Sequence, residues 1–267
     1  MIMKYRISVL MSIYNCADTL VAALDSLYAQ TYKDFKIILC EDGSKDDTYK
    51  VAEEYAKGHD NILLLRNPKN MGLNYSLNVC LAHADTEYCA RMDGDDISLP
   101  HRFKEEIEFL DSHPEYEIVS GPMQYFDENG VFMTGHGKGE VTKMDFVKGS
   151  PFCHAPCMVR TEAYKAVGGY TVDKRLLRVE DYHLWFKMYA AGYKGYMLAE
   201  PVYAMRDDRN AVARRNFKGK LHQAYVMFIG FRMLKMPLWC YVFCLRPIAV
   251  GLLPTSLYSY LHKNKKR

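Results

Sequence analysis

Two acidic segments of the chain have the residue types and spacing of groups that do chemistry. Asp93 and Asp95 lie one residue apart in a glycine-containing turn that follows a short apolar run. Carboxylates in this arrangement suit a divalent cation, which would neutralise a diphosphate leaving group. Glu180 and Asp181 precede an amphipathic stretch, so a carboxylate would be held at a helix start, as a general base requires. Together the segments predict transfer of a group from a nucleotide.

Each acidic segment also has a simpler interpretation. Acidic turns are common at protein surfaces, and Glu180 and Asp181 would also be favoured as helix-capping residues by the helix dipole. A calcium loop starting at Asp93 needs Gly at its sixth position and Glu at its twelfth, where this chain has Ser98 and Lys104. The calcium loop is therefore excluded, whereas the surface-turn and capping interpretations stay open.

The elements that must position these groups alternate between strand and helix over the first hundred residues. The apolar runs predict strands at 7–13, 35–40, 62–65 and 88–91 and helices from Asp18 onward, at 48–56 and at 75–84. Such repeats predict an α/β protein with a mostly parallel central sheet and right-handed crossovers. Ligands bind beyond the carboxyl ends of the strands in such sheets. Three polar clusters follow strands at that edge: 12–15, 41–44 and 93–95.

Asp42 belongs to the second of these clusters, in a turn that Gly43 permits. A carboxylate at this place can accept hydrogen bonds from a nucleotide base or a ribose hydroxyl. It can equally bond its own backbone, as turn carboxylates often do. Both interpretations of Asp42 stay open at this point.

The pattern changes after residue 100. We expect a helix at 102–113, a strand at 117–126 that ends in a hairpin turn at Asn129-Gly130, a strand at 157–160 and a helix at 182–191. Leu184, Trp185 and Met188 would face inward from the last helix. This mixed half predicts the floor and walls of a second pocket, and His154, in an apolar run, is expected to be a core histidine.

The last fifty residues are rich in Phe, Tyr, Leu and Met with scattered basic residues. The longest charge-free stretch there, 247–261, is shorter than the roughly 20 apolar residues that span a bilayer. Apolar helices with basic flanks predict contact with a membrane surface. The alternative is a helical pair that packs on the domain or on a second copy of the chain, so an oligomer is compatible with this segment.

Composition bounds the remaining possibilities. A chain of 267 residues with 25% charged residues is globular and large enough for a full core. Its net charge of +3 is small, and we predict no nucleic-acid partner. Eight cysteines without a Cys-x-x-Cys pair predict reduced, buried thiols rather than disulfides or zinc, even where Cys153 and Cys157 flank His154. The first residues lead directly into an apolar strand without a signal peptide, which predicts a cytoplasmic location.

With these residues in view, the sequence resembles the family 2 glycosyltransferases, which have the GT-A fold. The resemblance covers roughly residues 5–206 and rests on five segments: 7–15, 41–48, 90–102, 168–170 and 179–185. It is nearest in kind to bacterial enzymes that build capsule, exopolysaccharide and O-antigen repeat units. It implies a Rossmann-like sheet in a domain at 1–215, with a nucleotide-binding half at 1–100 and an acceptor-binding half at 101–215. A helical, basic extension at 216–267 would follow.

The resemblance also implies roles for individual residues. Ser12, Tyr14 and Asp42 would hold a uracil or thymine base and its ribose. Asp93 would contact ribose and metal, and Asp95 would ligate Mn²⁺ or Mg²⁺ on the donor diphosphate. A UDP-sugar is the expected donor, and a glycan or lipid-linked oligosaccharide the expected acceptor.

On the acceptor side, Asp181 would be the general base, and Glu180 and Trp185 would orient the acceptor. The reaction would invert the anomeric carbon in one displacement. The expected setting is the inner face of a bacterial plasma membrane, with the enzyme attached peripherally.

The chain departs from the family pattern in three places. Many relatives have an Arg near position 77 that contacts the diphosphate, where this chain has Leu77 followed by Asn78. Asn78 is therefore the residue expected to reach the nucleotide here. Many carry Tyr-Arg-x-His late in the domain, where this chain has residues 205–208, Met-Arg-Asp-Asp. The Arg residues at 206, 209, 214 and 215 could instead fold over phosphates or lie in a solvated loop. The Gln-x-x-Arg-Trp motif of processive synthases is absent, so one sugar per encounter is expected.

Two other functions remain as alternatives. A nucleotidyltransferase on a similar sheet would need a glycine-rich, basic first loop, whereas residues 12–16 contain no glycine. A nucleotide-sugar-binding protein without activity would not need Asp95 and Asp181. We therefore predict a metal-dependent glycosyltransferase.

Overall fold

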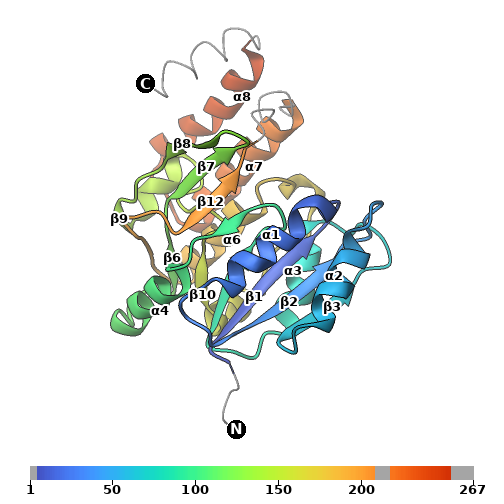
Figure 1. Cartoon of the computed structure of the whole chain (residues 1–267). Helices are drawn as coiled ribbons and strands as arrows, with labels where there is room; N and C mark the ends of the chain where they lie inside the picture. The colour runs from blue at the N-terminus through green and yellow to red at the C-terminus, as the bar shows by residue number, and fades with distance from the viewer. Residues whose placement is uncertain (1–4, 208–216, 254–267) are drawn as a thin grey trace.

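The computed structural model describes residues 5–207 and 217–253 of the chain. Its centre is an eight-stranded sheet with the strand order β3-β2-β1-β4-β10-β6-β11-β9 (Figure 1). In the first half, β1 (Ile7–Ile13) pairs in parallel with β2 (Phe35–Glu41) and with β4 (Tyr88–Met92), and β2 pairs in parallel with β3 (Ile62–Arg66). The four strands predicted in the first hundred residues are thereby confirmed.

The second half of this sheet is mixed. β10 (Met158–Arg160) runs antiparallel to β4 and to β6 (Ile118–Ser120). β11 (Gly195–Met197) runs parallel to β6, and β9 (Gly139–Val141) closes the sheet antiparallel to β11. These strands have only three residues each. The predicted strand at 157–160 corresponds to β10, whereas β9 and β11 had no predicted counterpart.

Helices cover both faces of the sheet, because successive strand residues such as Val9 and Leu10 point to opposite sides. Val9 belongs to an apolar cluster with side chains of α1 (Ala17–Tyr28), α2 (Thr48–Lys57) and α4 (Arg102–Ser112). Leu10 belongs to a second cluster with α3 (Leu73–Ala82), α5 (Thr161–Ala166), α6 (Glu180–Ala190) and α7 (Phe217–Met233). The expected α/β architecture is confirmed.

A smaller sheet has the order β5-β12-β7-β8 and contains β5 (Ile97–Ser98), β12 (Tyr203–Arg206), β7 (Met123–Asp127) and β8 (Gly130–Thr134). The single strand predicted at 117–126 is wrong, because β6 and β7 belong to different sheets. The chain changes sheet at Gly121-Pro122, where a Cβ on Gly121 would stand 2.4 Å from Cγ2 of Val202. The hairpin predicted at Asn129-Gly130 joins β7 to β8.

The C-terminal helices pack on the rest of the described chain. The ring of Phe231 in α7 lies 6.0 Å from that of Phe186 in α6, and both side chains are fully buried. The 3₁₀ helix η4 (Leu238–Cys244) and α8 (Leu245–Leu252) follow α7. Two further 3₁₀ turns are η1 (Lys143–Lys148), between β9 and β10, and η2 (Lys174–Leu176), between α5 and α6. Within 5–207 and 217–253, no helix has the length and apolar character needed to cross a membrane.

Candidate active site

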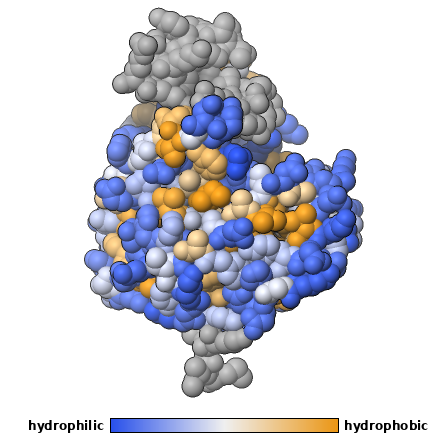
Figure 2. Space-filling view, in the orientation of Figure 1, coloured by the Kyte–Doolittle hydropathy of each residue, from blue (hydrophilic) through white to orange (hydrophobic). Residues whose placement is uncertain are grey.

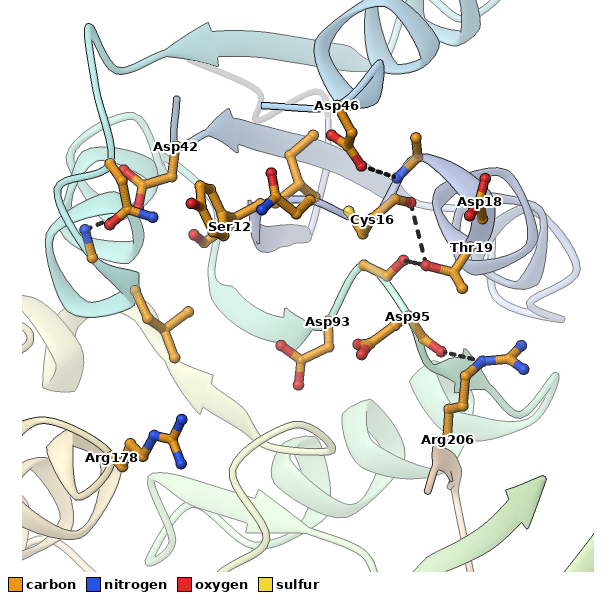
Figure 3. A pocket seen from close by; sticks show the side chains of 18 residues that line it. Ser12, Cys16, Asp18, Thr19, Asp42, Asp46, Asp93, Asp95, Arg178 and Arg206 are labelled. Atoms are coloured by element: carbon orange, nitrogen blue, oxygen red, sulfur yellow. Dashed lines mark hydrogen bonds between the residues drawn. The ribbon is translucent and has the colours of Figure 1, made fainter. Parts of the chain in front are cut away.

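The carboxyl ends of β1, β2 and β4 border a cavity of about 690 Å³ (Figure 3), a volume typical of ligand sites. Because β1 lies between β2 and β4 in parallel register, the loops after all three strands meet at one edge of the sheet. The cavity wall includes five residues predicted as donor or metal contacts: Ser12, Tyr14, Asp42, Asp93 and Asp95. The fold therefore brings the three polar clusters of the sequence together.

The acidic turn after β4 is packed directly beneath the loop that follows β1. Thr19 Oγ1, in α1, donates a hydrogen bond of 2.9 Å to the carbonyl of Gly94. A Cβ on Gly94 would lie 2.8 Å from Sγ of Cys16, which is closer than a side chain tolerates. A larger residue at the centre of the turn would therefore have to displace the Cys16 side chain.

The other side of the turn is held by β12. The backbone N–H of Asp93 donates to the Tyr203 hydroxyl at 3.2 Å, and the backbone N–H of Arg206 donates to Asp96 Oδ1 at 2.8 Å. Arg206 Nε also donates to the carbonyl of Asp95 at 3.2 Å. Strand β12, which the sequence did not reveal, therefore fixes the position of the acidic turn.

The carboxylates of this turn repel one another. Loss of surrounding water, and then the charge of Asp93, raise the pKa of Asp95. Burial, followed by the charges of Asp93 and Asp95, raises the pKa of Asp96 to about 8. Arg91, which is 3% exposed, forms an ion pair with Asp93. An additional positive charge at Asp93 and Asp95 would relieve the remaining repulsion.

A divalent cation fits this donor set. In the part of the chain that the structure describes, no three His, Cys, Asp or Glu side chains form a complete metal site. Two carboxylates suffice for Mg²⁺ or Mn²⁺ when substrate phosphates complete the coordination. Asp93 and Asp95 both face the cavity (Figure 3), whereas Asp96 is buried and bonded to β12.

Asp42 lies at the opposite wall of the cavity and is almost fully buried. Its carboxylate accepts hydrogen bonds from Asn67 Nδ2 at 2.7 Å, from the backbone N–H of Met71 at 2.8 Å and from that of Gly72 at 2.9 Å. A carboxylate has about four lone-pair sites, so one acceptor site is left for a ligand. Asp42 thus orders the loop at 67–72 and can still contact a base or ribose.

Two arginines bring positive charge to the same cavity, Arg178 and Arg206. In Figure 3 the Arg178 side chain enters from the side opposite Ser12 and Asp42. Its backbone has φ of 65°, a left-handed conformation that is uncommon for a residue other than glycine. Sequence reasoning missed Arg178, because a lone arginine before Val179 carries no pattern; the unusual backbone conformation is visible only in the structure.

Glu180 and Asp181 begin helix α6, but neither lines the cavity described above. Asp181 Oδ2 accepts a hydrogen bond of 3.4 Å from Ser150 Oγ. Burial raises the pKa of the Asp181 carboxyl, against the backbone N–H of Tyr182 and the charge of Arg91, which lower it. Burial also raises the pKa of Glu180. Because Arg91 pairs with Asp93 and also acts on Asp181, it links the two acidic segments electrostatically.

Two further residues with predicted roles lie outside this cavity. Trp185 is fully buried, with its ring 5.5 Å from that of Phe152 and 6.2 Å from that of His154. It lies one helical turn after Asp181, on the same face but deeper in the core.

Asn78 is likewise committed to the protein. Its Nδ2 donates to the carbonyl of Tyr170 at 2.7 Å, and its Oδ1 accepts from the backbone N–H of Tyr170 at 2.8 Å. Gly169 has φ of 59°, and a Cβ there would meet Asn78 Oδ1 at 2.5 Å. Asn78 therefore anchors the Gly168-Gly169-Tyr170 turn and does not line the cavity at the carboxyl ends of β1, β2 and β4.

His154 and the cysteines have structural surroundings. His154 Nε2 shares a hydrogen bond of 2.7 Å with the Tyr170 hydroxyl, and burial holds the pKa of His154 well below its usual value. The Cys157 thiol donates to the carbonyl of Cys153 at 2.9 Å, and all eight cysteines are free. The arginines at 209, 214 and 215 of the predicted cationic segment lie outside the described residues.

Comparisons with known proteins agree with this geometry. The family model described as glycosyl transferase family 2 matches residues 8–168, and the one described as glycosyl transferase family group 2 matches residues 89–262. The chain belongs to glycosyltransferase family 2. It is therefore an enzyme that transfers a sugar.

Several relatives carry names of the same kind. EpsE of Bacillus subtilis (strain 168), named as a candidate glycosyltransferase, is 38% identical over 97% of this chain and 94% of its own length. The amylovoran biosynthesis glycosyltransferase AmsE of Erwinia amylovora is 26% identical over 97% of this chain and 99% of its own. WfaP of Escherichia coli is 26% identical over 96% of this chain and 98% of its own length. It is named UDP-Glc:alpha-D-GlcNAc-diphosphoundecaprenol beta-1,3-glucosyltransferase.

Solved structures show the same GT-A fold. TarS 1–349 of S. aureus, crystallised with UDP, matches with a TM-score of 0.68 at 19% identity over 92% of this chain and 70% of that one. The mannosyltransferase PcManGT of Pyrobaculum calidifontis, in complex with GDP-Man and Mn²⁺, matches with a TM-score of 0.68 at 19% identity over 97% of this chain and 79% of that one. These likenesses establish the fold.

Proposed function

We propose that this enzyme moves one sugar from a nucleotide diphosphate donor, a UDP-sugar in the first instance, to a lipid-linked glycan in bacterial surface polysaccharide synthesis. We further propose that it requires a divalent metal and inverts the anomeric carbon. One observation carries the proposal: the predicted base-, ribose- and metal-binding residues, which come from three separate loops, line a single cavity. The names of AmsE and WfaP support the polysaccharide setting and the lipid-linked acceptor.

The donor would lie across the carboxyl ends of β1, β2 and β4. Ser12, Tyr14 and Asp42 form the wall that would receive the base and ribose. Tyr14 is 39% exposed, so its ring is available for stacking on a base. Arg178, across the cavity, is placed to form charge-assisted bonds with the diphosphate, and it would replace the arginine that family members have near position 77.

Asp93 and Asp95 would hold Mn²⁺ or Mg²⁺ against the donor phosphates. When bound, the metal neutralises negative charge that develops on the departing diphosphate. The ion pair between Arg91 and Asp93 keeps one of the two carboxylates oriented toward the cavity without the metal. The backbone N–H of Arg206, in β12, donates to Asp96 and so holds the turn that carries both carboxylates.

Asp181 would accept the proton of the acceptor hydroxyl. The acceptor oxygen then forms a bond with the anomeric carbon while the bond from that carbon to the diphosphate oxygen breaks, and the nucleoside diphosphate leaves with the electron pair. This single displacement inverts the carbon and needs no covalent intermediate. A carboxylate whose pKa is raised by burial, as that of Asp181 is, is a stronger base than an ordinary aspartate.

The proposal is tested by screening UDP-, GDP- and dTDP-sugars for stabilisation against thermal unfolding, with and without Mn²⁺. A ligand at 100 times its Kd adds about 2.7 kcal/mol, or about 5 °C or more in Tm for a protein of this size. Asp95→Asn should remove the part of the shift that depends on metal. Asp18→Asn, which removes an exposed carboxylate from the same cavity wall, is the matched control and should keep it.

If no nucleotide sugar stabilised the protein in the presence of metal, the assignment of this cavity to the donor would be wrong. If stabilisation were the same for wild type and Asp95→Asn, the metal assignment alone would fail. Product analysis with the stabilising donor, by mass spectrometry of glycolipid acceptors, then tests the transfer and the configuration of the new bond.

A further inference from the structure

The C-terminal helices expose an unusual amount of apolar surface. Among residues 5–207 and 217–253, nine of the 19 exposed large apolar side chains lie between 217 and 252. Leu238 is 88% exposed, Val242 66% and Leu252 71%. Figure 2 shows one face of the molecule, on which patches of apolar side chains lie among polar ones. In Figure 1, α7 and α8 lie at the upper end of the molecule. Exposed apolar side chains scattered singly are ordinary, but a contiguous group marks an interaction surface.

The exposed side chains follow the helical periods of η4 and α8. In a 3₁₀ helix residues three apart lie on one line, and Trp239, Val242 and Leu245 have this spacing and are all exposed. Cys240 and Cys244, on the other side of η4, are buried against α7. Leu252 lies seven residues after Leu245 and so continues the same face along α8. We name Leu238, Trp239, Val242, Leu245 and Leu252 the η4 surface.

The charge around the η4 surface has one sign. The described residues 217–253 include five Lys and Arg and no Asp or Glu, and Lys235 and Arg246, near the two ends of η4, are both exposed. In the sequence as a whole, residues 209–267 contain 12 Lys and Arg without a single acidic residue. The first 208 residues have 23 Lys and Arg against 32 Asp and Glu. The chain is therefore divided into an acidic catalytic part and a basic, apolar end.

This combination distinguishes between the occupants that could cover the surface. A second copy of the chain would bring its own basic residues to the same face, and these charges would repel. An anionic lipid bilayer offers apolar depth for the exposed side chains and negative headgroups for the cations. A tryptophan among the exposed residues is also typical of the membrane interface, where its ring sits at headgroup level.

We propose that the η4 surface lies in the interface of an anionic bilayer, parallel to the membrane plane. The contact extends the proposed function, since it would hold the enzyme where a lipid-linked acceptor resides. The carboxyl ends of β1 and β2, which border the donor cavity, point toward the half of the molecule that holds α7 and α8 (Figure 1). The same contact would therefore bring the cavity toward the lipid.

The experiment uses the full chain and its intrinsic fluorescence, because the protein has only two tryptophans. Trp185 is fully buried and Trp239 is 56% exposed, so a shift on adding vesicles reports Trp239. Phosphatidylglycerol–phosphatidylethanolamine vesicles should shift the emission to the blue, and the protein should float with them in a density gradient. Pure phosphatidylcholine vesicles should bind at least about tenfold more weakly, and high salt should weaken binding to the anionic vesicles.

The variant Val242→Ser/Leu245→Ser/Leu252→Ser keeps Trp239 as the probe and removes three apolar side chains of the η4 surface. Its apparent partition coefficient should fall by at least about tenfold. The matched control is Leu63→Ser/Val131→Ser/Val172→Ser, which removes three exposed apolar side chains elsewhere and should float like wild type. Trp239→Phe should float but lose the spectral shift.

Two results would overturn the proposal. One is equal flotation of the η4 variant and the control. The other is a blue shift that grows with protein concentration without vesicles, together with a dimer in sedimentation velocity, which would assign the surface to a second copy. Vesicle binding is measured without donor or metal, so its failure would leave the proposed transfer reaction untouched, and failure of the donor screen would leave vesicle binding untouched.

Discussion

Replacing Asp181 by asparagine is the sharpest test of the proposed base. The substitution keeps the size of the side chain and its ability to accept a hydrogen bond from Ser150, but the amide cannot take a proton. Loss of a general base costs roughly a hundredfold to ten-thousandfold in rate, which corresponds to about 2.7–5.5 kcal/mol of transition-state stabilisation. Donor affinity should change little, because Asp181 does not line the cavity that contains Asp93 and Asp95.

The rate is measured as release of nucleoside diphosphate in the presence of acceptor, and donor affinity by isothermal titration calorimetry with metal present. Glu162→Gln is the matched control, because Glu162 is an exposed carboxylate in the first turn of α5, as Asp181 is in the first turn of α6. The control should keep both the rate and the affinity. An Asp181→Asn enzyme with wild-type turnover would refute the assignment of the base, and an equal loss of donor affinity would place Asp181 in the donor site instead.

The pH dependence of the transfer rate is a second test of Asp181. Burial raises the pKa of Asp181 in the folded protein, so the base becomes protonated, and the rate falls, at a pH above the usual range for aspartate. The free energy of unfolding should have the opposite pH dependence. Folding favours the protonated Asp181 carboxyl, so the stability gained from its protonation is complete below the pKa of the unfolded state and is lost as the pH rises through the pKa of the folded state. Asp181→Asn should therefore be at least as stable as wild type at pH 7.

Three further substitutions test the support of the site. Arg102→Met breaks the fully buried pair with Glu106 and should lower the free energy of unfolding by about 3–5 kcal/mol, and adding Glu106→Leu should restore most of it in urea denaturation. Gly94→Ala should lower the free energy of unfolding by about 1–3 kcal/mol through overpacking, because its Cβ would stand 2.8 Å from Sγ of Cys16. It should also weaken donor binding in calorimetry, and unchanged binding would contradict the close packing of the turn. Arg178→Ala should weaken binding of a nucleoside diphosphate by roughly ten- to a hundredfold and leave nucleoside binding unchanged, and an equal loss for both would remove Arg178 from the phosphate site.

The parallel half of the fold could be predicted because most residues of its strands are apolar. Ile7 in β1 and Ile37 in β2 are fully buried, and helical segments with polar faces separate these runs. Polar residues directly after each strand must then meet at one edge of the sheet, which is why five of the predicted site residues line one cavity.

The rest of the fold and of the candidate site depends on contacts between residues that are far apart in the sequence. Strands of three residues, such as β6 and β11, are too short to show a period, and the change of sheet at Gly121-Pro122 follows from the position of Val202 rather than from a local signal. Family resemblance placed Trp185 at the acceptor because it lies in the same motif as Asp181, whereas helix geometry puts it one turn deeper. Arg178 enters the cavity through a backbone conformation that the sequence does not predict.

The bonds from β12 to the acidic turn join residues about 110 positions apart, since Tyr203 contacts Asp93 and Arg206 contacts Asp96. In a nascent chain that has not yet extended past residue 206, the acidic turn at 93–96 would lack these two hydrogen bonds. A cation should consequently prefer the finished protein to any shorter intermediate and add its binding energy to the last stage of folding. Metal supplied during synthesis would then raise the yield of active enzyme, beyond any role in turnover.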